Sequence, residues 1–457
     1  MGVAHKMIKK MPSPLGKLYY KLIPFKYRYS PVFRNTYDFL LKSQGWSLRQ
    51  HQEHQQSELN KLLEHAYQNT PYYRRVFDER GLKPKDIQTT SALKKLPFLT
   101  KTIIRKNFND LIAQNIDRNS SIIFKTSGST GEHLEFLGTD DMYKKEAAFI
   151  LRAFNAHGAS LYNRPSIWLR RYVPKANQSL SKPDHEMNRL YLSAYHLSTE
   201  HIHTYAQIIN KSKIETLVTY PSAVYILACL LEEHQLKLPH LKHVHVASEK
   251  LLPEWKAKAE NVLGIPVKAH YGQMEKVVLM HQTADSDNYV DNPEYGVTEL
   301  IPENRQHLIV GTSFMNYIMP MIRYKTNDTA ELYTGAQPKH GLPLAVRDIF
   351  GRCDDILVSE TGHMLPGVNF YTMMYKVPGV KMFSLVQKNQ QELDVMLVRG
   401  EHWAERSAQT LEQNLQERLG KIKINWNFVS DIPRSEQTGK IRCIRNQING
   451  TTIQQAS

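Results

Sequence analysis

The segment Thr126-Ser127-Gly128-Ser129-Thr130-Gly131, or TSGSTG, decides how the rest of the chain is interpreted. It combines hydroxyl side chains with two glycines and follows the apolar run Ile122 to Phe124. Glycine reaches positive φ at little cost, so the backbone N–H groups of such a loop can converge on one point that suits a phosphate. A polar hairpin turn is the alternative, and only partner motifs elsewhere in the chain can decide between the two.

The residues after Gly131 separate two kinds of phosphate loop. The P-loop of nucleoside triphosphatases needs Gly, four residues and then Gly-Lys-Ser/Thr at the start of a helix, and that pattern does not follow here. Instead, the segment from His133 to Leu137 alternates polar and apolar side chains, which predicts a strand. The unit is therefore expected to be strand, loop, strand.

Length and composition indicate a globular protein of more than one domain. A chain of 457 residues is too long for one compact core. No apolar run approaches the roughly 18 residues of a membrane span, and the N-terminus lacks a signal-peptide pattern, so we expect a cytoplasmic protein. Cys229, Cys353 and Cys443 lie far apart, which indicates neither a disulfide framework nor a structural zinc site.

The chain is basic, with 59 Lys and Arg against 44 Asp and Glu, a formal charge of +15. Its first acidic residue is Asp38, and the preceding segment 6–34 mixes Lys and Arg with aromatic and aliphatic residues. Such a segment is typical either of contact with an anionic membrane surface or of a solvated arm packed on its own domain, and we favour the arm. Without a recognition motif, net charge alone does not indicate a nucleic-acid partner, and we predict none.

Periodicity predicts a layered α/β domain. Ser47 and Gln50 form a capping box for one helix, and Thr139 caps another. Strands and helices then alternate, which is typical of helices packed on a sheet. The expected strands are 166–172, 214–219, 242–247 and 267–270, with helices that begin at Pro221 and Pro253.

The pattern changes near Gly351, where hairpin-like segments replace the alternation. Strands are expected within 355–365 and at 422–429, with a helix over 405–419. We predict a large domain over residues 1–350, including a basic arm over 1–46, and a small C-terminal domain over 351–457.

Four further stretches join the loop as candidate functional motifs. They are YGQME from Tyr271 to Glu275, YKTND from Tyr324 to Asp328, GRCDD from Gly351 to Asp355, and the pair Gly439-Lys440. Singly, each is as well explained by a structural role. In this order and at these separations, the chain resembles the adenylate-forming superfamily of acyl-CoA synthetases, and more closely its phenylacetate-CoA ligase branch, which includes relatives in capsular polysaccharide biosynthesis.

The resemblance implies a large layered α/β domain followed by a small, mobile α+β lid domain. It also implies that the site activates a carboxylate with ATP. The loop Thr126 to Gly131 would hold the β- and γ-phosphates, and Glu275 would bind Mg²⁺. Tyr271 and Gly272 would lie against the adenine, opposite Ser248 and Glu249.

The resemblance also assigns residues beyond the adenine. Asp328 would accept hydrogen bonds from the ribose hydroxyls, with Arg352 at the ribose or phosphate. Lys440 would reach the α-phosphate and the acid carboxylate during adenylation. Asp354 occupies the hinge about which the lid would rotate between two half-reactions.

Several positions depart from the family pattern. Met274 replaces a usual Thr or Ser, Lys325 a usual Arg and Asn327 a common Gly. Asparagine tolerates positive φ, so that turn is expected to survive. Glu132 stands where the common pattern has a Lys, and its charge would repel phosphate unless it points away.

The leading hypothesis is an ATP- and Mg²⁺-dependent ligase that adenylates a small carboxylic acid and passes the acyl group to coenzyme A. An amine on a sugar or polysaccharide precursor is the alternative acceptor, and a non-catalytic binding protein is the rival from another class. Relatives in this branch are often homodimers. Two sets of residues are candidates for the pocket that holds the acid. An aromatic or apolar pocket would be lined by Trp168, Tyr195, His196, Tyr220 and Met274. Alternatively, Arg170 and Arg171 would admit an acid with a second carboxylate.

Overall fold

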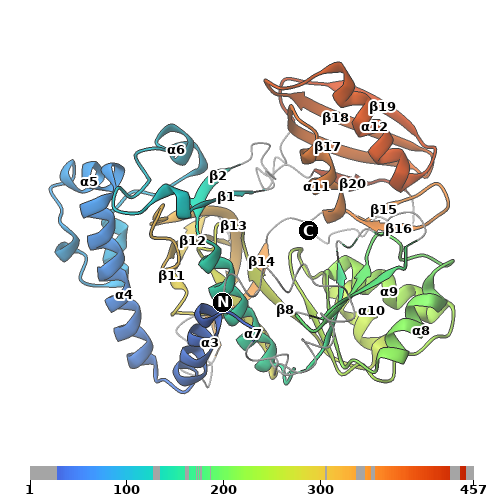
Figure 1. Ribbon diagram of the computed structural model, residues 1–457, viewed down its shortest axis with the longest axis horizontal. Coiled ribbons are helices and arrows are strands. Elements are labelled where there is room, and N and C mark those ends of the chain that lie inside the picture. Colours follow the sequence, from blue (N-terminus) through green and yellow to red (C-terminus); the bar gives the residue numbers. More distant parts are fainter. Residues whose placement is uncertain are drawn as a thin grey trace.

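The computed structural model describes residues 28–126, 134–159, 164–170, 172, 174, 178–185, 187–303, 306–335, 345–350, 356–432 and 443–448. A 12-stranded sheet with the order β11-β12-β13-β14-β10-β9-β8-β7-β6-β3-β5-β4 runs through the large domain. A smaller α+β domain built on a 4-stranded sheet follows at the C-terminal end (Figure 1). This arrangement confirms the predicted fold class.

One half of the large sheet is mainly parallel and carries the predicted strand–helix alternation. Helices α8 to α10 pack on one face of this half, and Pro221 and Pro253 stand at the first turns of α9 and α10 as expected. Gly264, with φ of +69°, ends α10 in the left-handed conformation. The elements are β3 (Ser166–Arg170), β4 (Ser181–Asp184), β5 (Arg189–Ser193), α8 (Ile202–Ser212), β6 (Thr216–Thr219), α9 (Pro221–Glu233), β7 (His243–Val246), α10 (Pro253–Leu263) and β8 (Val267–Gly272).

The other half of the sheet is antiparallel and was not expected from the sequence, which placed the change of character near Gly351. It begins at β9, far earlier in the chain. Its strands are β9 (Leu279–Thr283), β10 (Ser286–Asp291), β11 (Gly296–Glu303), β12 (Gln306–Ser313), β13 (Tyr324–Leu332) and β14 (Ala345–Phe350). Strand β9 and most of β12 are buried along their length, so neither shows the alternation that marks a half-exposed strand.

Helices at the N-terminal end pack against the antiparallel half. The predicted capping box is confirmed: Ser47 N donates to Gln50 Oε1 at 2.9 Å and Gln50 N to Ser47 Oγ at 3.3 Å. The described part of the basic arm is helix α3, which buries Phe33, Tyr37 and Leu40. These elements are α3 (Pro31–Ser43), α4 (Leu48–Asn69), α5 (Pro71–Asp78) and α6 (Lys101–Lys106), with 3-10 turns at Pro84–Asp86, Thr90–Lys95 and Arg118–Ser120.

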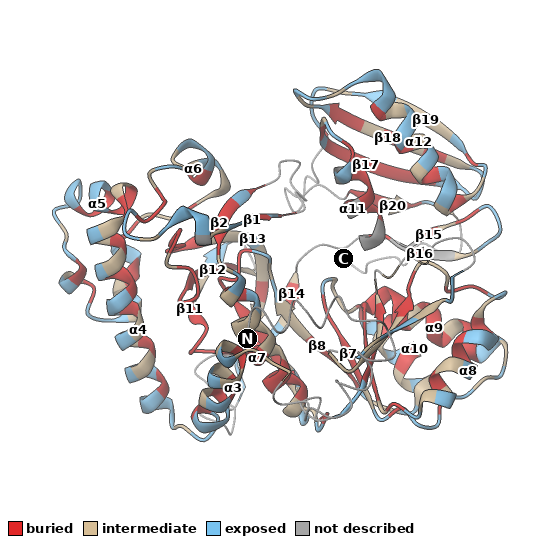
Figure 2. Ribbon diagram, viewed as in Figure 1, coloured by how far each residue is buried: buried red, intermediate tan, exposed pale blue. Residues whose placement is uncertain are grey.

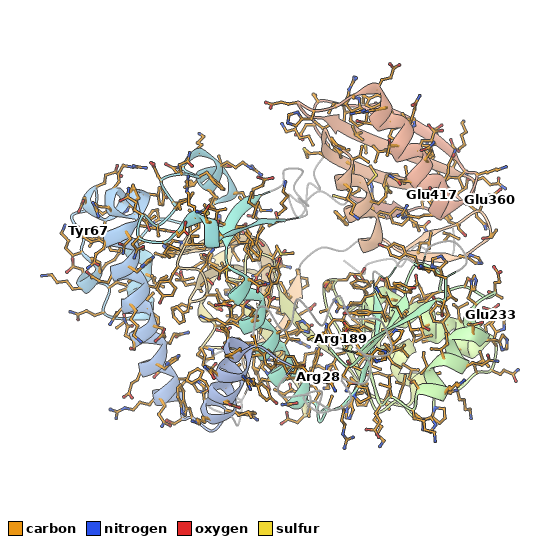
Figure 3. All side chains as sticks on the ribbon, in the orientation of Figure 1. Arg28, Tyr67, Arg189, Glu233, Glu360 and Glu417 are labelled. Carbon is orange, nitrogen blue, oxygen red and sulfur yellow. The ribbon has the colours of Figure 1, made fainter. Side chains whose placement is uncertain are left out.

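The C-terminal domain has its own core, formed between its sheet and helices α11 and α12. Figure 2 shows buried residues concentrated in β17 and β18. The turn with Glu360 packs against the end of α12, on the same side of the domain as Glu417 (Figure 3), where Glu360 N donates to the carbonyl of Leu419 at 2.6 Å. The elements are β15 (Ile356–Val358), β16 (Met364–Pro366), α11 (Val368–Lys376), β17 (Val380–Asn389), β18 (Glu392–Arg399), α12 (Glu405–Leu419), β19 (Lys423–Phe428) and β20 (Ile444–Asn446).

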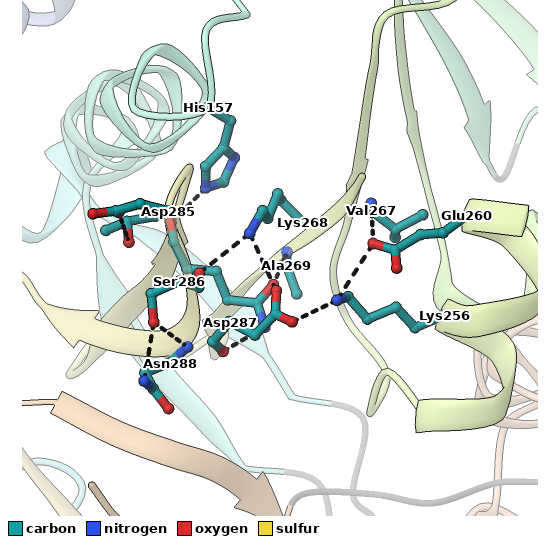
Figure 4. A network of polar contacts seen from close by, with 12 residues as sticks. His157, Lys256, Glu260, Val267, Lys268, Ala269, Asp285, Ser286, Asp287 and Asn288 are labelled. Atoms are coloured by element: carbon teal, nitrogen blue, oxygen red, sulfur yellow. Dashed lines mark hydrogen bonds and ion pairs between the residues drawn. The ribbon is translucent and has the colours of Figure 1, made fainter. Parts of the chain in front are cut away.

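Polar contacts join β8 to β9 and β10, and join α10 to β10. Asp287 accepts from Lys268 at 3.1 Å and from Lys256 at 2.6 Å, and Lys256 also lies 3.3 Å from Glu260 (Figure 4). The side chain of Gln282 accepts from the backbone N–H of Ala269 at 2.8 Å. These contacts join the parallel and antiparallel halves at β8, the strand that carries Tyr271.

Helix α7 (Asp140–Asn155) covers the other face of the parallel strands and ends beside a group of buried histidines. His157 Nδ1 lies 3.0 Å from His245 Nδ1, and His157 Nε2 contacts the carbonyl of Gln282. A carbonyl only accepts, so Nε2 of His157 carries the proton and His245 Nδ1 donates to His157 Nδ1. This arrangement holds two neutral imidazoles together.

Acidification is expected to destabilise this region through His157. Burial lowers the pKa of His157 to about 4, and the shift corresponds to about 3 kcal/mol. The pKa of His157 in the unfolded chain is higher. The contribution of the neutral, buried imidazole to the unfolding free energy is therefore complete above pH ~6.5 and is lost as the pH falls from there towards 4. Replacement of His157 by Gln should flatten this part of a plot of unfolding free energy against pH, as measured by urea unfolding.

Asp291 is expected to change the unfolding free energy with pH in the opposite direction, and it serves as the internal control for that experiment. Burial raises its pKa to about 7, so its contribution falls as the pH rises from about 4 to 7. The comparison of His157→Gln with wild type cancels the Asp291 contribution. Parallel profiles for the two proteins would contradict the role assigned to His157.

Candidate active site

Adjacent parallel strands bring the candidate residues to one edge of the sheet. Strands β3, β6, β7 and β8 are neighbours and all run the same way. The residues at or just after their carboxyl ends are Arg170, Tyr220, Ser248 with Glu249, and Tyr271 with Gly272. In open α/β sheets, ligands bind outside the carboxyl ends of the strands.

The strand–loop–strand unit predicted around TSGSTG is confirmed at its base. Strands β1 (Ile122–Lys125) and β2 (Glu135–Gly138) pair antiparallel. Thr126 N donates to the carbonyl of Leu134 at 2.9 Å, and Leu134 N donates to Thr126 Oγ1 at 3.2 Å. The hydroxyl of Thr126 therefore helps to close the base of the loop, whereas residues 127–133 lie outside the described part of the chain.

Glu275 is buried and held by a tyrosine from another strand. The hydroxyl of Tyr324, the first residue of β13, donates to Glu275 Oε1 at 2.7 Å. Burial and the neighbouring Glu275 charge raise the pKa of Tyr324 well above its usual range, so the hydroxyl stays protonated and keeps donating. One carboxylate oxygen of Glu275 is thus fixed by the protein, which orients the group.

The residues on either side of Glu275 connect it to the phosphate hairpin. Met274 Sδ accepts from the hydroxyl of Tyr143 at 3.8 Å, and the ring of Tyr143 stacks on Phe124 with centroids 4.7 Å apart. Lys276, with φ of +53°, places its ammonium 4.6 Å from the centre of the Tyr143 ring and pairs with Glu146. The segment that carries Glu275 therefore lies against the hairpin that leads into TSGSTG.

Asp328 and Tyr271 are hydrogen-bonded partners. The hydroxyl of Tyr271 donates to Asp328 Oδ2 at 2.8 Å. Burial, with the Asp328 charge, raises the pKa of Tyr271 well above its usual range. Asn327 has φ of +64°, which confirms that asparagine supports the left-handed turn where the family commonly has glycine. A carboxylate has about four acceptor sites, so Asp328 can bind Tyr271 and a ligand hydroxyl together.

The two motif carboxylates, Glu275 and Asp328, belong to one group. The charges of both contribute to the raised pKa of Tyr324, after its burial. The group holds two fixed carboxylates and two tyrosines at the end of β8 and the start of β13. Its chemistry suits a ligand that brings hydroxyls to one carboxylate and a cation or cation–phosphate group to the other.

Ser248 and Glu249 shape the edge after β7. Ser248 has φ of +80°, an uncommon conformation for a residue with a side chain. Glu249 Oε2 accepts from Ser222 N at 3.0 Å and from Ser222 Oγ at 2.6 Å, at the start of α9. The structure thus gives Glu249 a role in capping a helix, and its contact with adenine stays a prediction.

Other predicted site residues fall outside the described part of the chain. They are Ser127, Gly128, Ser129, Thr130, Gly131, Arg352, Asp354 and Lys440. The predicted domain boundary at 350–351 adjoins residues 351–355, which also lie outside the described part of the chain. Residues that the sequence analysis missed are Tyr143 and the pair Glu146–Lys276, because their relation to the site is visible only once α7 lies beside β8.

The donor set at Glu275 fits Mg²⁺. Mg²⁺ prefers oxygen ligands and is often held by one or two protein carboxylates together with substrate phosphates. Glu275 supplies such an oxygen next to the hairpin. Among the described residues there is no cluster of three or more His, Cys, Asp and Glu side chains that could hold a metal alone, and no helix that is long and apolar enough to cross a membrane.

The chain is similar in sequence to known proteins. A family model described as the CapK C-terminal domain matches residues 357–447. The chain is 25% identical to Protein CapK of Staphylococcus aureus, over 93% of this chain and 100% of that protein. It is 26% identical to the phenylacetate-coenzyme A ligase of Pseudomonas putida, over 69% of this chain and 73% of that protein.

A solved structure shares the fold. The 2-hydroxyisobutyryl-CoA ligase in complex with 2-HIB-AMP and CoA superposes with a TM-score of 0.55 at 18% identity, over 89% of this chain and 92% of that one. The sequence relatives and this shared fold confirm the resemblance carried by the motifs. These similarities support the superfamily and branch that the motifs indicated, the adenylate-forming enzymes and, among them, the branch that contains the phenylacetate-CoA ligases and CapK.

Proposed function

We propose that the protein uses ATP and Mg²⁺ to adenylate a small carboxylic acid, with release of pyrophosphate, and then transfers the acyl group to coenzyme A. The observation that carries the proposal is the joint placement of Glu275 and Asp328. Tyr324 and Tyr271 hydrogen-bond to the two carboxylates at 2.7 and 2.8 Å. Met274, next to Glu275, contacts Tyr143, whose ring stacks on Phe124 in the hairpin of the candidate phosphate loop. A nucleotide needs these elements together.

Each described residue has a task in this proposal. Tyr271 lies against the adenine and positions Asp328, which accepts from the ribose hydroxyls. Tyr324 orients Glu275 so that its carboxylate meets the bound cation. When bound, Mg²⁺ supplies positive charge that neutralises the phosphate oxygens. Fixed carboxylates and donors of this kind act through positioning and electrostatic stabilisation.

The C-terminal domain supplies the remaining residues. Lys440 approaches the α-phosphate and the carboxylate, and Asp354 marks the hinge about which the domain turns before acyl transfer. One domain that presents different faces in two steps allows a single site to serve both half-reactions. On this proposal, the domain boundary lies at 350–351.

The match to CapK keeps a second acceptor in view. The family model matched by residues 357–447 is that of CapK, and this domain is the one that would present the acceptor. An amine on a sugar or polysaccharide precursor is therefore the alternative to coenzyme A. Assays with a pre-formed acyl-adenylate separate them: loss of the coenzyme A thiol supports the first, and amide formation without thiol loss supports the second.

Acid-dependent exchange of labelled pyrophosphate into ATP is the test of adenylation, and Glu275→Gln should slow it about 100-fold. The substitution keeps the shape and removes the charge that faces the cation, and losses of this size are typical of single electrostatic contacts. Glu254→Gln, an exposed carboxylate at the start of α10, is the matched control and should leave exchange unchanged.

Exchange in wild type, lost in Glu275→Gln and retained in Glu254→Gln, supports the proposal. Absence of exchange across a broad panel of acids, together with a rise in melting temperature when ATP is added, would instead identify a nucleotide-binding protein without this activity.

A further inference from the structure

Arg170 lies at the candidate site, at the end of β3, although no motif includes it. Its Nη2 donates to the carbonyl of Thr219 at 3.2 Å, and its guanidinium lies 4.9 Å from the centre of the Tyr220 ring and 5.5 Å from that of Trp168. The guanidinium is thus positioned over the end of β6, at the same edge that carries Tyr271 two strands further along.

Tyr220 adds an independent observation. Its side chain is 1% exposed, and its hydroxyl has no hydrogen-bond partner among the described residues. A buried hydroxyl without a partner costs about 1–3 kcal/mol, so such groups usually have an explanation such as a missing ligand or water. Here the hydroxyl belongs to a ring that contacts a guanidinium at the carboxyl edge of the sheet.

The position of these two residues indicates what they would meet. Neighbouring strands are about 4.8 Å apart, so the end of β6 lies about 10 Å from β8, where the nucleotide would lie against Tyr271. That distance leaves room for a small acid between the adenylate phosphate and Arg170. The reacting carboxylate of such an acid faces the phosphate, and its far end faces Arg170 and Tyr220.

We propose that the acid substrate carries a second carboxylate, which is bound by Arg170 and hydrogen-bonded by Tyr220. This inference rests on the proposed adenylation and names the class of acid. A guanidinium has five N–H donors in a planar fork, so it can serve the Thr219 carbonyl and a ligand carboxylate at once. Its contacts with two aromatic rings hold the fork in place, which suits selective binding.

Paired acids test the proposal in the pyrophosphate-exchange assay. Each dicarboxylic acid is compared with the monocarboxylic acid of the same chain or ring size. Wild type should show a kcat/KM at least about 100-fold higher for one dicarboxylic acid than for its matched acid, because sites built around polar partners reject analogues that lack them. Arg170→Met should abolish that preference, mainly through KM, while matched monocarboxylic acids keep or gain activity.

Two further variants separate ligand binding from structure. Tyr220→Phe should raise KM for the preferred dicarboxylic acid about tenfold without lowering thermal stability, since it removes a hydroxyl that lacks a partner. Arg189→Met is the matched control. Arg189 also contacts the Trp168 ring, at 4.0 Å, but it pairs with the first residue of β3, at the other end of that strand from Arg170, so the preference should be retained.

The outcomes distinguish this inference from the proposed function. Exchange by wild type without a preference for any dicarboxylic acid, or a preference that Arg170→Met leaves unchanged, would overturn the second-carboxylate site and leave adenylation in place. Absence of all exchange would count against adenylation, and calorimetric binding of the same acid pairs to wild type and Arg170→Met would then decide the site. If Arg170→Met does not fold, Arg170→Lys, which keeps the charge and loses the fork, replaces it and should weaken the preference.

Discussion

Replacement of Lys440 by Ala is expected to slow acid-dependent pyrophosphate exchange by about 1,000-fold. In the proposed mechanism, negative charge accumulates on the α-phosphate as the carboxylate attacks it, and the Lys440 ammonium is the mobile cation that meets that charge. Removal of a single contact that stabilises transition-state charge commonly costs about 100- to 1,000-fold in rate. The upper end of this range is expected because, in the proposed mechanism, the C-terminal domain would bring this charge to the site only for adenylation.

The second half-reaction makes the test specific. Transfer of the acyl group from a pre-formed adenylate to coenzyme A should proceed in Lys440→Ala at close to the wild-type rate, since the rotated domain withdraws the lysine. Lys421→Ala, an exposed lysine of the same domain, should change neither step. Equal loss in both half-reactions would contradict the domain rotation, and an unchanged exchange rate would remove Lys440 from the mechanism.

The extent to which the sequence predicted the fold depended on what each segment buries. The helix over 405–419 was predicted with its observed bounds because its apolar side chains recur along one face and its other face is exposed. Strands β6 to β8 were located because helices with clear starts and stops separate them. Strand β9 lacks both signals, since it is buried and is joined to its neighbour by a short turn.

The site was predictable where a motif carries the chemistry and unpredictable where a contact across the fold does. Glu275 and Asp328 were identified from their motifs, and the structure brings them together. The hydrogen bond from Tyr324 to Glu275 joins two motifs that are distant in sequence, and no local pattern specifies it. The contact of Glu249 with Ser222 is another example: the resemblance placed Glu249 near the adenine, which stays a prediction, and no local pattern indicated that its carboxylate caps α9.

A buried ion pair between α7 and the loop after β10 supplies the second large effect. Arg152 Nη1 lies 2.6 Å from Glu294 Oε1, Nη2 donates to Oε2 at 3.1 Å, and Nη2 also contacts Asn292. Ser43, the last residue of α3, donates to the same carboxylate. The Arg152 and Glu294 side chains are 6% and 0% exposed. The pair therefore joins α3, α7 and the antiparallel strands in the interior.

Glu294→Gln is expected to lower the unfolding free energy by about 3–5 kcal/mol, because it leaves the Arg152 charge buried without its counter-charge. Arg152→Met should cost a similar amount, since it strands the carboxylate instead. The double variant Arg152→Met with Glu294→Gln should cost clearly less than the sum of the two, because neither charge then remains. Urea unfolding of the four proteins measures the coupling.

The pH dependence of the unfolding free energy gives a second measure of how much the Arg152–Glu294 pair stabilises the fold. Burial alone would raise the pKa of Glu294, but the charge and hydrogen bonds of Arg152, with the Ser43 hydroxyl, outweigh it and bring the pKa down to about 2. In the unfolded chain this pKa is near 4.3, so the pair's contribution is complete above that pH and is lost as the pH falls towards 2. The steep loss of stability in this acid range should be present in wild type and absent in Glu294→Gln. Additive costs in the double variant, or an unchanged acid profile, would show that Arg152 and Glu294 do not stabilise the fold as a pair.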